Sequence, residues 1–176
     1  ADIFKEAGTE EQKACDDKAA AVVEKVNTVD TEGVTEKLAK GFNFTVWNDM
    51  FSRCLGCGVC TYVCPTCHCF DIADEGDSAH GQRVRNWDTC QFSLFTLHAS
   101  GHNPRTSGKE RMRQRIMHKY AYFEELFHEI GCTGCGRCVR HCPVDLDIRQ
   151  ILASARLAAE SVAAVPAGER QERQDG

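Results

Sequence analysis

A duplicated cysteine motif constrains this chain more than any other feature of its sequence. Both copies read C-x2-C-x2-C-x3-C-P: the first is Cys54, Cys57, Cys60, Cys64 and Pro65, and the second is Cys132, Cys135, Cys138, Cys142 and Pro143. Three cysteines at intervals of three residues can wrap one face of a 4Fe-4S cube from a single loop, and in such pairs of motifs the fourth cysteine binds the other cluster. The motifs therefore predict two 4Fe-4S clusters with crossed ligation.

Crossed ligation assigns ligands from both motifs to each cluster. One cluster is expected on Cys54, Cys57, Cys60 and Cys142, and the other on Cys132, Cys135, Cys138 and Cys64. Zinc is the competing metal, because C-x2-C pairs also build zinc fingers. Two repeats of four cysteines, each with a trailing Cys-Pro, favour iron-sulfur clusters over closed tetrahedral zinc sites.

Three further cysteines, Cys67, Cys69 and Cys90, lie between the two motifs. One interpretation is a third iron-sulfur centre on these three thiols, with a fourth ligand from His68, His98, His102 or another chain. The alternative is that they are buried thiols beneath the first cluster, because free cysteine is among the most buried residue types. The sequence leaves both interpretations open.

Composition and charge exclude several classes of function. The 176 residues include twelve cysteines and carry a formal net charge of -5, which does not suggest a nucleic-acid or anionic-membrane partner. No apolar run is long enough to span a bilayer, and the N-terminal residues are too charged for a secretory signal. We therefore expect a cytoplasmic chain without a transmembrane segment, whose cysteines bind metal.

Helical periodicity dominates the chain outside the cysteine motifs. Apolar residues recur at helical spacing in four segments, which are residues 9–27, 31–40, 109–130 and 147–162. Cys15 is expected in a core, and the basic run from Lys109 to Arg115 is expected on a solvated helix face. Residues 70–108 lack sustained periodicity and are expected to form an irregular loop. The expected fold class is mainly α, with an irregular insertion between the motifs.

Three segments follow from this pattern. Residues 1–46 are expected to form an N-terminal helical extension, residues 47–163 a 4Fe-4S dicluster domain, and residues 164–176 a flexible tail.

Five strings carry a resemblance to a known family: CLGCGVCTYVCPTCHCFD, RVRNWDTCQF, GHNPR, HKY and GCTGCGRCVRHCPVDLDI. Together they resemble the cluster-binding region of the β subunit of cytosolic nickel-iron hydrogenases (sulfhydrogenases) and of the corresponding subunit of anaerobic sulfite reductase, over residues 47–151. The resemblance implies an α-helical ferredoxin-type dicluster domain. It also implies two partners: one is a flavin- and nicotinamide-binding subunit, and the other is a subunit that holds the catalytic metal. Members of the family usually carry a larger N-terminal region than this chain does.

The chain has no Gly-rich dinucleotide fingerprint, no P-loop and no nucleophile-base pair with a recognisable spacing. We therefore expect a non-catalytic electron-transfer subunit of an oxidoreductase complex. It would relay electrons through two 4Fe-4S clusters between the flavin-bearing partner and a catalytic subunit of hydrogenase or sulfur-compound reductase type. The alternatives are a freestanding ferredoxin-like carrier and a subunit of a heterodisulfide reductase-type complex. The helical flanks and the long insertion favour fixed neighbours over a free carrier.

Overall fold

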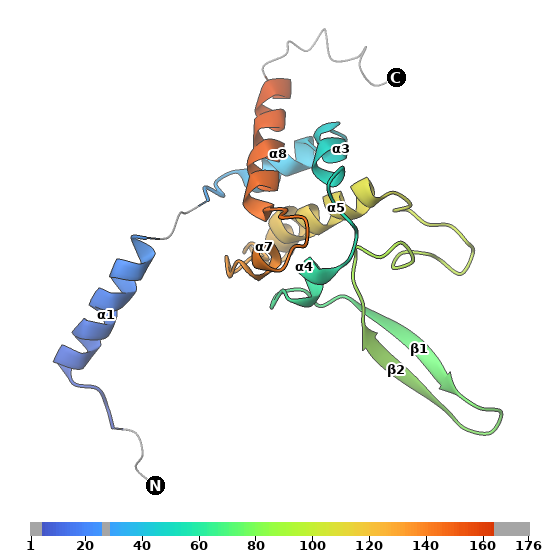
Figure 1. Ribbon diagram of the computed structural model, residues 1–176, viewed down its shortest axis with the longest axis horizontal. Coiled ribbons are helices and arrows are strands. Elements are labelled where there is room, and N and C mark those ends of the chain that lie inside the picture. The colour runs from blue at the N-terminus through green and yellow to red at the C-terminus, as the bar shows by residue number, and fades with distance from the viewer. Residues whose placement is uncertain (1–4, 26–28, 164–176) are drawn as a thin grey trace. The chain divides into compact units, whose positions relative to one another are not determined.

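The structure is a computed structural model that describes residues 5–25 and 29–163 (Figure 1). The chain divides into two compact units, residues 1–31 and residues 32–176, and each is described by itself. The segment boundaries expected from the sequence stay a prediction, and the expected tail at 164–176 lies outside the described residues.

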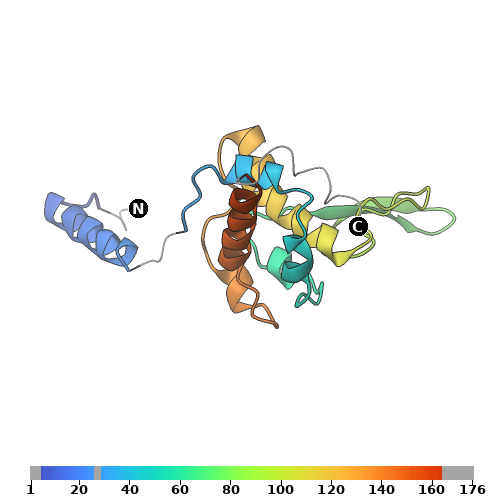
Figure 2. The same ribbon diagram turned by 90° about the horizontal axis from the view of Figure 1, so that it is seen from above.

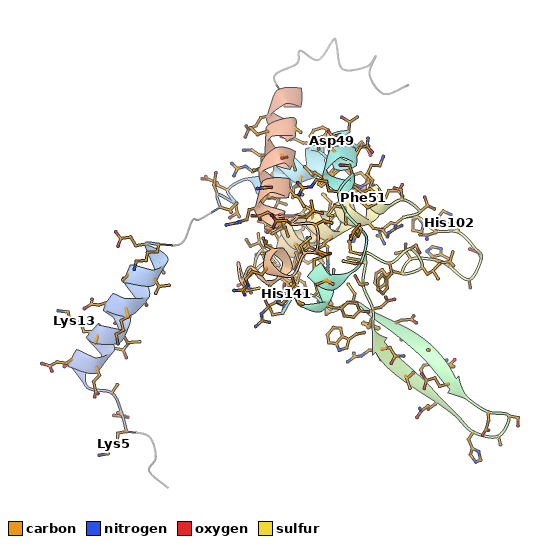
Figure 3. All side chains as sticks on the ribbon, in the orientation of Figure 1. Lys5, Lys13, Asp49, Phe51, His102 and His141 are labelled. Atoms are coloured by element: carbon orange, nitrogen blue, oxygen red, sulfur yellow. The ribbon has the colours of Figure 1, made fainter. Side chains whose placement is uncertain are left out.

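The described residues of the first unit form one helix, α1 (Thr9–Val23). The helix begins after Gly8, whose backbone N–H donates a hydrogen bond of 2.8 Å to the carboxylate of Glu11. None of its residues is buried, and Lys13 points away from the helix (Figure 3). The expected core position of Cys15 is therefore wrong, because its side chain is exposed on a helix that buries none of its residues.

The core of the second unit lies between four helices, which are α2 (Val34–Lys40), α3 (Val46–Phe51), α5 (Gly108–Met117) and α8 (Ile148–Ala163). Their buried apolar side chains include Val34, Leu38, Trp47, Met50, Met112, Ile116, Ile148, Ile151, Leu152 and Ala155. The indole N–H of Trp47 donates a hydrogen bond of 2.9 Å to the carbonyl of Gly41, so this large buried side chain has its polar group satisfied. The helices expected at residues 31–40 and 147–162 are confirmed as α2 and α8.

The long helix expected at residues 109–130 is present as three consecutive pieces. After α5 the chain continues as a π-helix, η1 (His118–Tyr122), and then as α6 (Phe123–Phe127). His128 has the positive φ of 59° that ends the helix, and the N–H of Gly131 returns to the carbonyl of Lys119 at 2.7 Å. Single π-helical turns inside helices occur often at functional sites, so η1 is a candidate position for a functional residue.

The insertion contains a β-hairpin that the sequence pattern did not predict. Strand β1 (Phe70–Gly76) pairs with β2 (Gly81–Trp87) in antiparallel register, from Phe70 opposite Trp87 to Gly76 opposite Gly81. The expected mainly α fold class is therefore wrong, and the structure is a small mixed arrangement of helices and one two-stranded sheet. Almost every hairpin residue is exposed on both faces, so burial imposes no alternation of apolar and polar residues. In both views the hairpin projects from the helices of this unit (Figures 1 and 2).

Two one-turn helices complete the second unit, α4 (Val59–Tyr62) and α7 (Arg137–Arg140). Each follows the first two cysteines of one motif, and the two helices lie against each other. The two cysteine motifs, 78 residues apart between Cys54 and Cys132, are thus brought side by side by the fold.

The first turn of α5 packs closely on the end of α3. Phe51 lies beside the start of α5 (Figure 3), and a Cβ atom on Gly108 would lie 1.8 Å from Cζ of the Phe51 ring. We expect Gly108→Ala to lower the free energy of unfolding by about 1–3 kcal/mol through overpacking. Thermal unfolding of the cluster-loaded chain measures this effect. Gly81→Ala is the matched control, because its nearest neighbour would be 3.7 Å away; equal losses in the two variants would contradict the packing argument.

Candidate metal centre

The two cysteine motifs adopt the same local backbone conformation. In the first, Gly56 and Gly58 have φ of 66° and 75°, and in the second, Gly134 and Gly136 have φ of 65° and 70°. In each motif the second of these glycines caps a one-turn helix, α4 or α7. The left-handed conformation strains any residue with a Cβ atom, so the sequence C-x-G-C-G recurs because the same loop is built twice.

Glycine is also required at residue 58 by its surroundings. A Cβ atom there would lie 2.7 Å from Cγ2 of Thr89, whose hydroxyl is hydrogen-bonded to that of Thr61. Thr61 also donates to the carbonyl of Gly58 at 2.7 Å. These contacts fasten the loop of the first motif to the segment that follows β2, so the insertion supports the cysteine loop.

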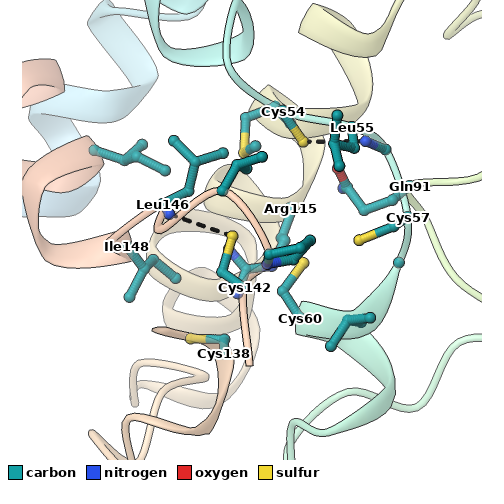
Figure 4. Close-up of a pocket in the computed structure, with 17 residues that line it drawn as sticks. Cys54, Leu55, Cys57, Cys60, Gln91, Arg115, Cys138, Cys142, Leu146 and Ile148 are labelled. Carbon is teal, nitrogen blue, oxygen red and sulfur yellow. Dashed lines mark hydrogen bonds between the residues drawn. The ribbon is translucent and has the colours of Figure 1, made fainter. Parts of the chain in front are cut away.

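Cysteines from both motifs line one pocket (Figure 4). They are Cys54, Cys57, Cys60, Cys138 and Cys142. The remaining lining is largely apolar and includes Leu55, Val59, Met112, Leu146, Ile148 and Ile151. Backbone N–H groups already point at two of the sulfur atoms, since Gly56 donates to Cys54 at 3.4 Å and Leu146 donates to Cys142 at 3.2 Å. The pocket therefore combines four thiols of the set expected for the first cluster with backbone donors to sulfur.

Arg115 is the charged group in this pocket, and it was expected on a solvated helix face. That expectation is wrong, because the side chain is only 4% exposed. Its Nε and Nη2 atoms have no hydrogen-bond partner. Burial opposes the charge of Arg115, but the neighbouring thiols of Cys60 and Cys138 outweigh it and raise the pKa of the guanidinium. A buried guanidinium needs an anion, and clusters ligated by thiolates supply negative charge, so the residues present fit that cofactor.

The second expected set of ligands meets around Lys119, in the π-helix η1. The ammonium group of Lys119 donates hydrogen bonds to Sγ of Cys64 at 3.2 Å, to Thr66 at 2.9 Å and to the carbonyl of Gly131 at 2.8 Å. Gly131 immediately precedes Cys132, so these bonds hold the last cysteine of the first motif beside the start of the second motif. Lys119 is 4% exposed.

The surroundings of Cys64 favour its thiolate state. Hydrogen bonds from Cys67 and Thr66 and the charge of Lys119 lower the pKa of Cys64 to about 4, against the opposing effect of burial. Tyr120 lies beside Cys132, and its pKa is raised by burial and by a hydrogen bond to that thiol. A thiolate is the form that binds iron, so these contacts favour ligation at Cys64.

The three additional cysteines form two contacts rather than one group. Cys67 is hydrogen-bonded to Cys64, and Cys69 is hydrogen-bonded to Cys90. Cys69 and Cys90 flank the base of the hairpin, where the N–H of Asp88 donates to the carbonyl of Cys69 at 3.1 Å. Within residues 5–25 and 29–163, no three His, Cys, Asp or Glu side chains form a site for a single ion. A cube holds its thiolates farther apart than a single ion does, so a third cluster here stays a prediction.

The histidines considered as fourth ligands form two ring pairs. His98 packs edge-on against His102 with ring centroids 5.4 Å apart, and His68 packs against His118 at 5.7 Å. His68 also lies near Cys69, and its charge helps to lower the pKa of that thiol, although the hydrogen bond from Cys90 is the larger cause.

Replacing Cys69 and Cys90 by alanine tests the third centre. Cys69 and Cys90 are hydrogen-bonded to each other and remain free thiols. We therefore expect the double variant to keep the iron content of the parent chain, about eight atoms for two cubes. Anaerobic iron analysis measures it, with Cys15→Ala, on the exposed face of α1, as the control. A loss of about four irons in the double variant alone would instead establish a third cluster.

The pattern of the sequence could have revealed Arg115 and Lys119. Arg115 lies between Met112 and Ile116 on the apolar face of α5, and Lys119 follows one turn later. A cation in the apolar stripe of a helix is a signal for a buried anion or cofactor. The run of basic residues before Arg115 concealed this signal, because the other members lie on more exposed faces of the helix.

These features define a class: the chain belongs to the 4Fe-4S dicluster domain family, which matches residues 53–146, and it carries two 4Fe-4S clusters. Over 159 residues it is 34% identical to the Sulfhydrogenase 2 subunit beta of Pyrococcus furiosus. The alignment covers 88% of this chain and 46% of the relative, so the chain spans about half of the length of the protein that it resembles. No solved structure matches the chain. No helix in the described part of the chain is long and apolar enough to cross a membrane.

Proposed function

We propose that this chain is the electron-transfer part of a multisubunit redox enzyme of hydrogenase or sulfur-compound reductase type. When bound, the two 4Fe-4S clusters supply one-electron transfer between a flavin- and nicotinamide-bearing partner and a catalytic subunit. The observation that carries the proposal is the pocket in which Cys54, Cys57 and Cys60 meet Cys142 of the other motif. Crossed ligation places the two clusters close together, as a relay needs.

The proposed ligands are those of the crossed pattern. The first cluster takes Cys54, Cys57, Cys60 and Cys142, and the second takes Cys132, Cys135, Cys138 and Cys64. The contacts of Lys119 support the second set, because they join Cys64 to the residue before Cys132. Membership in the dicluster family supports the pair of clusters without deciding which cysteine binds which cluster.

Each proposed cluster has a ligand at the protein surface. Cys57 and Cys135, the second cysteines of the two motifs, are both exposed, whereas the other motif cysteines are half-buried. Because the two residues belong to different proposed clusters, one cluster can exchange electrons with one partner and the second cluster with another. A relay between two neighbouring subunits needs such a pair of surface approaches.

Exposed apolar side chains favour fixed neighbours over a diffusing carrier. Leu55, beside the exposed Cys57, is 67% exposed, and Leu94 and Trp87 of the insertion are 71% and 70% exposed. Leu55 and Leu94 line one surface hollow together with Phe92 and Leu97, and contiguous exposed apolar surface marks protein interaction sites. The flavin- and nicotinamide-binding partner and the subunit with the catalytic metal follow from the resemblance to hydrogenase β subunits, and a cytoplasmic location is proposed on the same ground.

Anaerobic iron and sulfide analysis, with electron paramagnetic resonance after dithionite reduction, tests the cofactor part of the proposal. We expect about eight irons and eight sulfides, with a spectrum broadened by coupling between two reduced cubes. Zinc without inorganic sulfide would contradict it.

The native mass of the protein purified from its source tests the subunit part. A complex that contains a flavoprotein and a subunit with a catalytic metal is expected. A monomer would favour the ferredoxin-like carrier.

A further inference from the structure

Two buried cations from one helical segment face the cysteines of both motifs. Arg115 lies in the last turn of α5 and Lys119 in the first turn of η1, one helical turn later. Each side chain is 4% exposed. The chain therefore holds two full positive charges away from water, where burying an ion costs free energy unless an anion is present.

In the part of the chain that the structure describes, no carboxylate forms an ion pair with either of these two side chains. Lys37 pairs with Glu160, Arg83 with Asp74 and Arg149 with Asp147, and none of these ion pairs includes Arg115 or Lys119. Lys119 donates only to a thiol, a hydroxyl and a carbonyl, and two nitrogen atoms of Arg115 lack any partner. The anions that these cations face are therefore the sulfur ligands and whatever those ligands bind.

The two cations face different ligand sets. Arg115 lines the same pocket as Cys60 of the first motif and Cys138 of the second, which belong to different proposed clusters (Figure 4). Lys119 bonds directly to Cys64, a proposed ligand of the second cluster. Arg115 is thus next to ligands of both proposed clusters, whereas Lys119 contacts a ligand of one.

We propose that Arg115 is the shared potential-setting residue of the two clusters, and that Lys119 sets the potential of only the cluster that Cys64 binds. The inference rests on the proposed ligand assignment. Reduction adds one negative charge to a cluster, and a fixed positive charge beside it stabilises the reduced state more than the oxidised state. Since both side chains are buried, solvent and salt screen this effect little. Both residues therefore raise potentials, and they act on different numbers of clusters.

Redox titration of the full chain, followed by electron paramagnetic resonance, tests the assignment. Arg115→Gln removes the charge and keeps hydrogen-bonding capacity, and we expect both midpoint potentials to become more negative. A tenfold change in each reduction equilibrium, about 59 mV for a one-electron couple, is the expected scale. Lys119→Gln is expected to make one midpoint potential more negative by a similar amount and to leave the other unchanged. The difference between the two midpoint potentials therefore changes in this variant.

Two further variants serve as controls. Arg113→Gln removes a charge from the same helix, but Arg113 stacks on the Phe42 ring at 3.8 Å and bonds to the Phe42 carbonyl, so its loss should leave both midpoints unchanged. Arg115→Lys keeps the charge, and it should restore most of the shift that Arg115→Gln produces. A purely structural role of Arg115 would not give this rescue of the potential.

The outcomes separate the inference from the proposed function. Eight irons with unchanged midpoints in Arg115→Gln would overturn the inference and leave the dicluster function standing. If Arg115→Gln does not bind iron, the inference is tested with Arg115→Lys and Lys119→Gln instead. A Lys119→Gln chain in which both midpoint potentials stay in place, or in which both move equally, would overturn the inference. A parent chain without iron and sulfide would overturn the proposed function itself.

Discussion

Removal of iron is expected to unfold most of the second unit. Without the clusters, Arg115 remains buried with two of its nitrogen atoms unpartnered, and Lys119 keeps only the single thiolate of Cys64. The effective penalty of a buried charge without its anion is several kcal/mol, which is comparable with the whole stability of a domain, about 5–15 kcal/mol. The clusters also join the two cysteine loops, and that link disappears with the iron. Far-ultraviolet circular dichroism and amide hydrogen exchange, before and after anaerobic chelation, measure the loss.

A double variant separates the two causes of this unfolding. Replacing Arg115 and Lys119 by methionine removes the buried charges but leaves every cysteine in place. After chelation, this variant is expected to retain more helix and more exchange protection than the iron-free parent, since the core formed by α2, α3, α5 and α8 is otherwise apolar. An iron-free parent chain with native exchange protection in α5 would contradict the expectation.

Paired cysteine substitutions are expected to reveal the crossed ligation through iron content alone. Cys142→Ala should reduce the iron of the chain from about eight atoms to about four, because one cluster loses a ligand. Adding Cys57→Ala removes a second ligand from the same proposed cluster, so the chain should keep about four irons. Adding Cys135→Ala to Cys142→Ala instead removes one ligand from each proposed cluster, so the chain should bind almost no iron. Iron and sulfide analysis of the three anaerobically purified variants distinguishes these cases.

The opposite pattern would identify ligation within each motif. In that case Cys142 and Cys135 would share a cluster, and the chain with both substitutions would keep about four irons. A pair that includes the last cysteine of the first motif gives an independent test, since Cys64→Ala with Cys135→Ala should keep about four irons under crossed ligation. Cys15→Ala is the control for the loss of a thiol, because Cys15 lies in the first unit and is exposed.

The parts of the structure that local chemistry determines could be predicted from the sequence. The cysteine spacing predicted the cofactor, because a cube of fixed size demands ligands at fixed intervals along a loop. The periodicity of residues 31–40 and 147–162 predicted α2 and α8, since both helices bury one apolar stripe in a common core.

The parts that depend on a cofactor or on exposed backbone pairing could not be predicted in the same way. The hairpin has no buried face, so its strands lack the alternation that indicates a sheet. Its local support is instead specific: Arg83 pairs with Asp74 across the strands at 2.7 Å, and Asp77 accepts two backbone hydrogen bonds in the turn. Arg115 was expected at the surface because it belongs to a run of basic residues. The negative charge that faces Arg115 comes from the cofactor, which hydrophobic periodicity does not report.

The geometry of the hairpin allows its length to change without a change in the cysteine loops. The two strands of the hairpin begin and end at one base, where the backbone N–H of Asp88 donates a hydrogen bond to the carbonyl of Cys69. Because antiparallel strands lengthen or shorten in pairs, residues can be added or lost beyond this base without moving either cysteine loop. The length of the hairpin can therefore vary while the arrangement of the two cysteine loops stays the same.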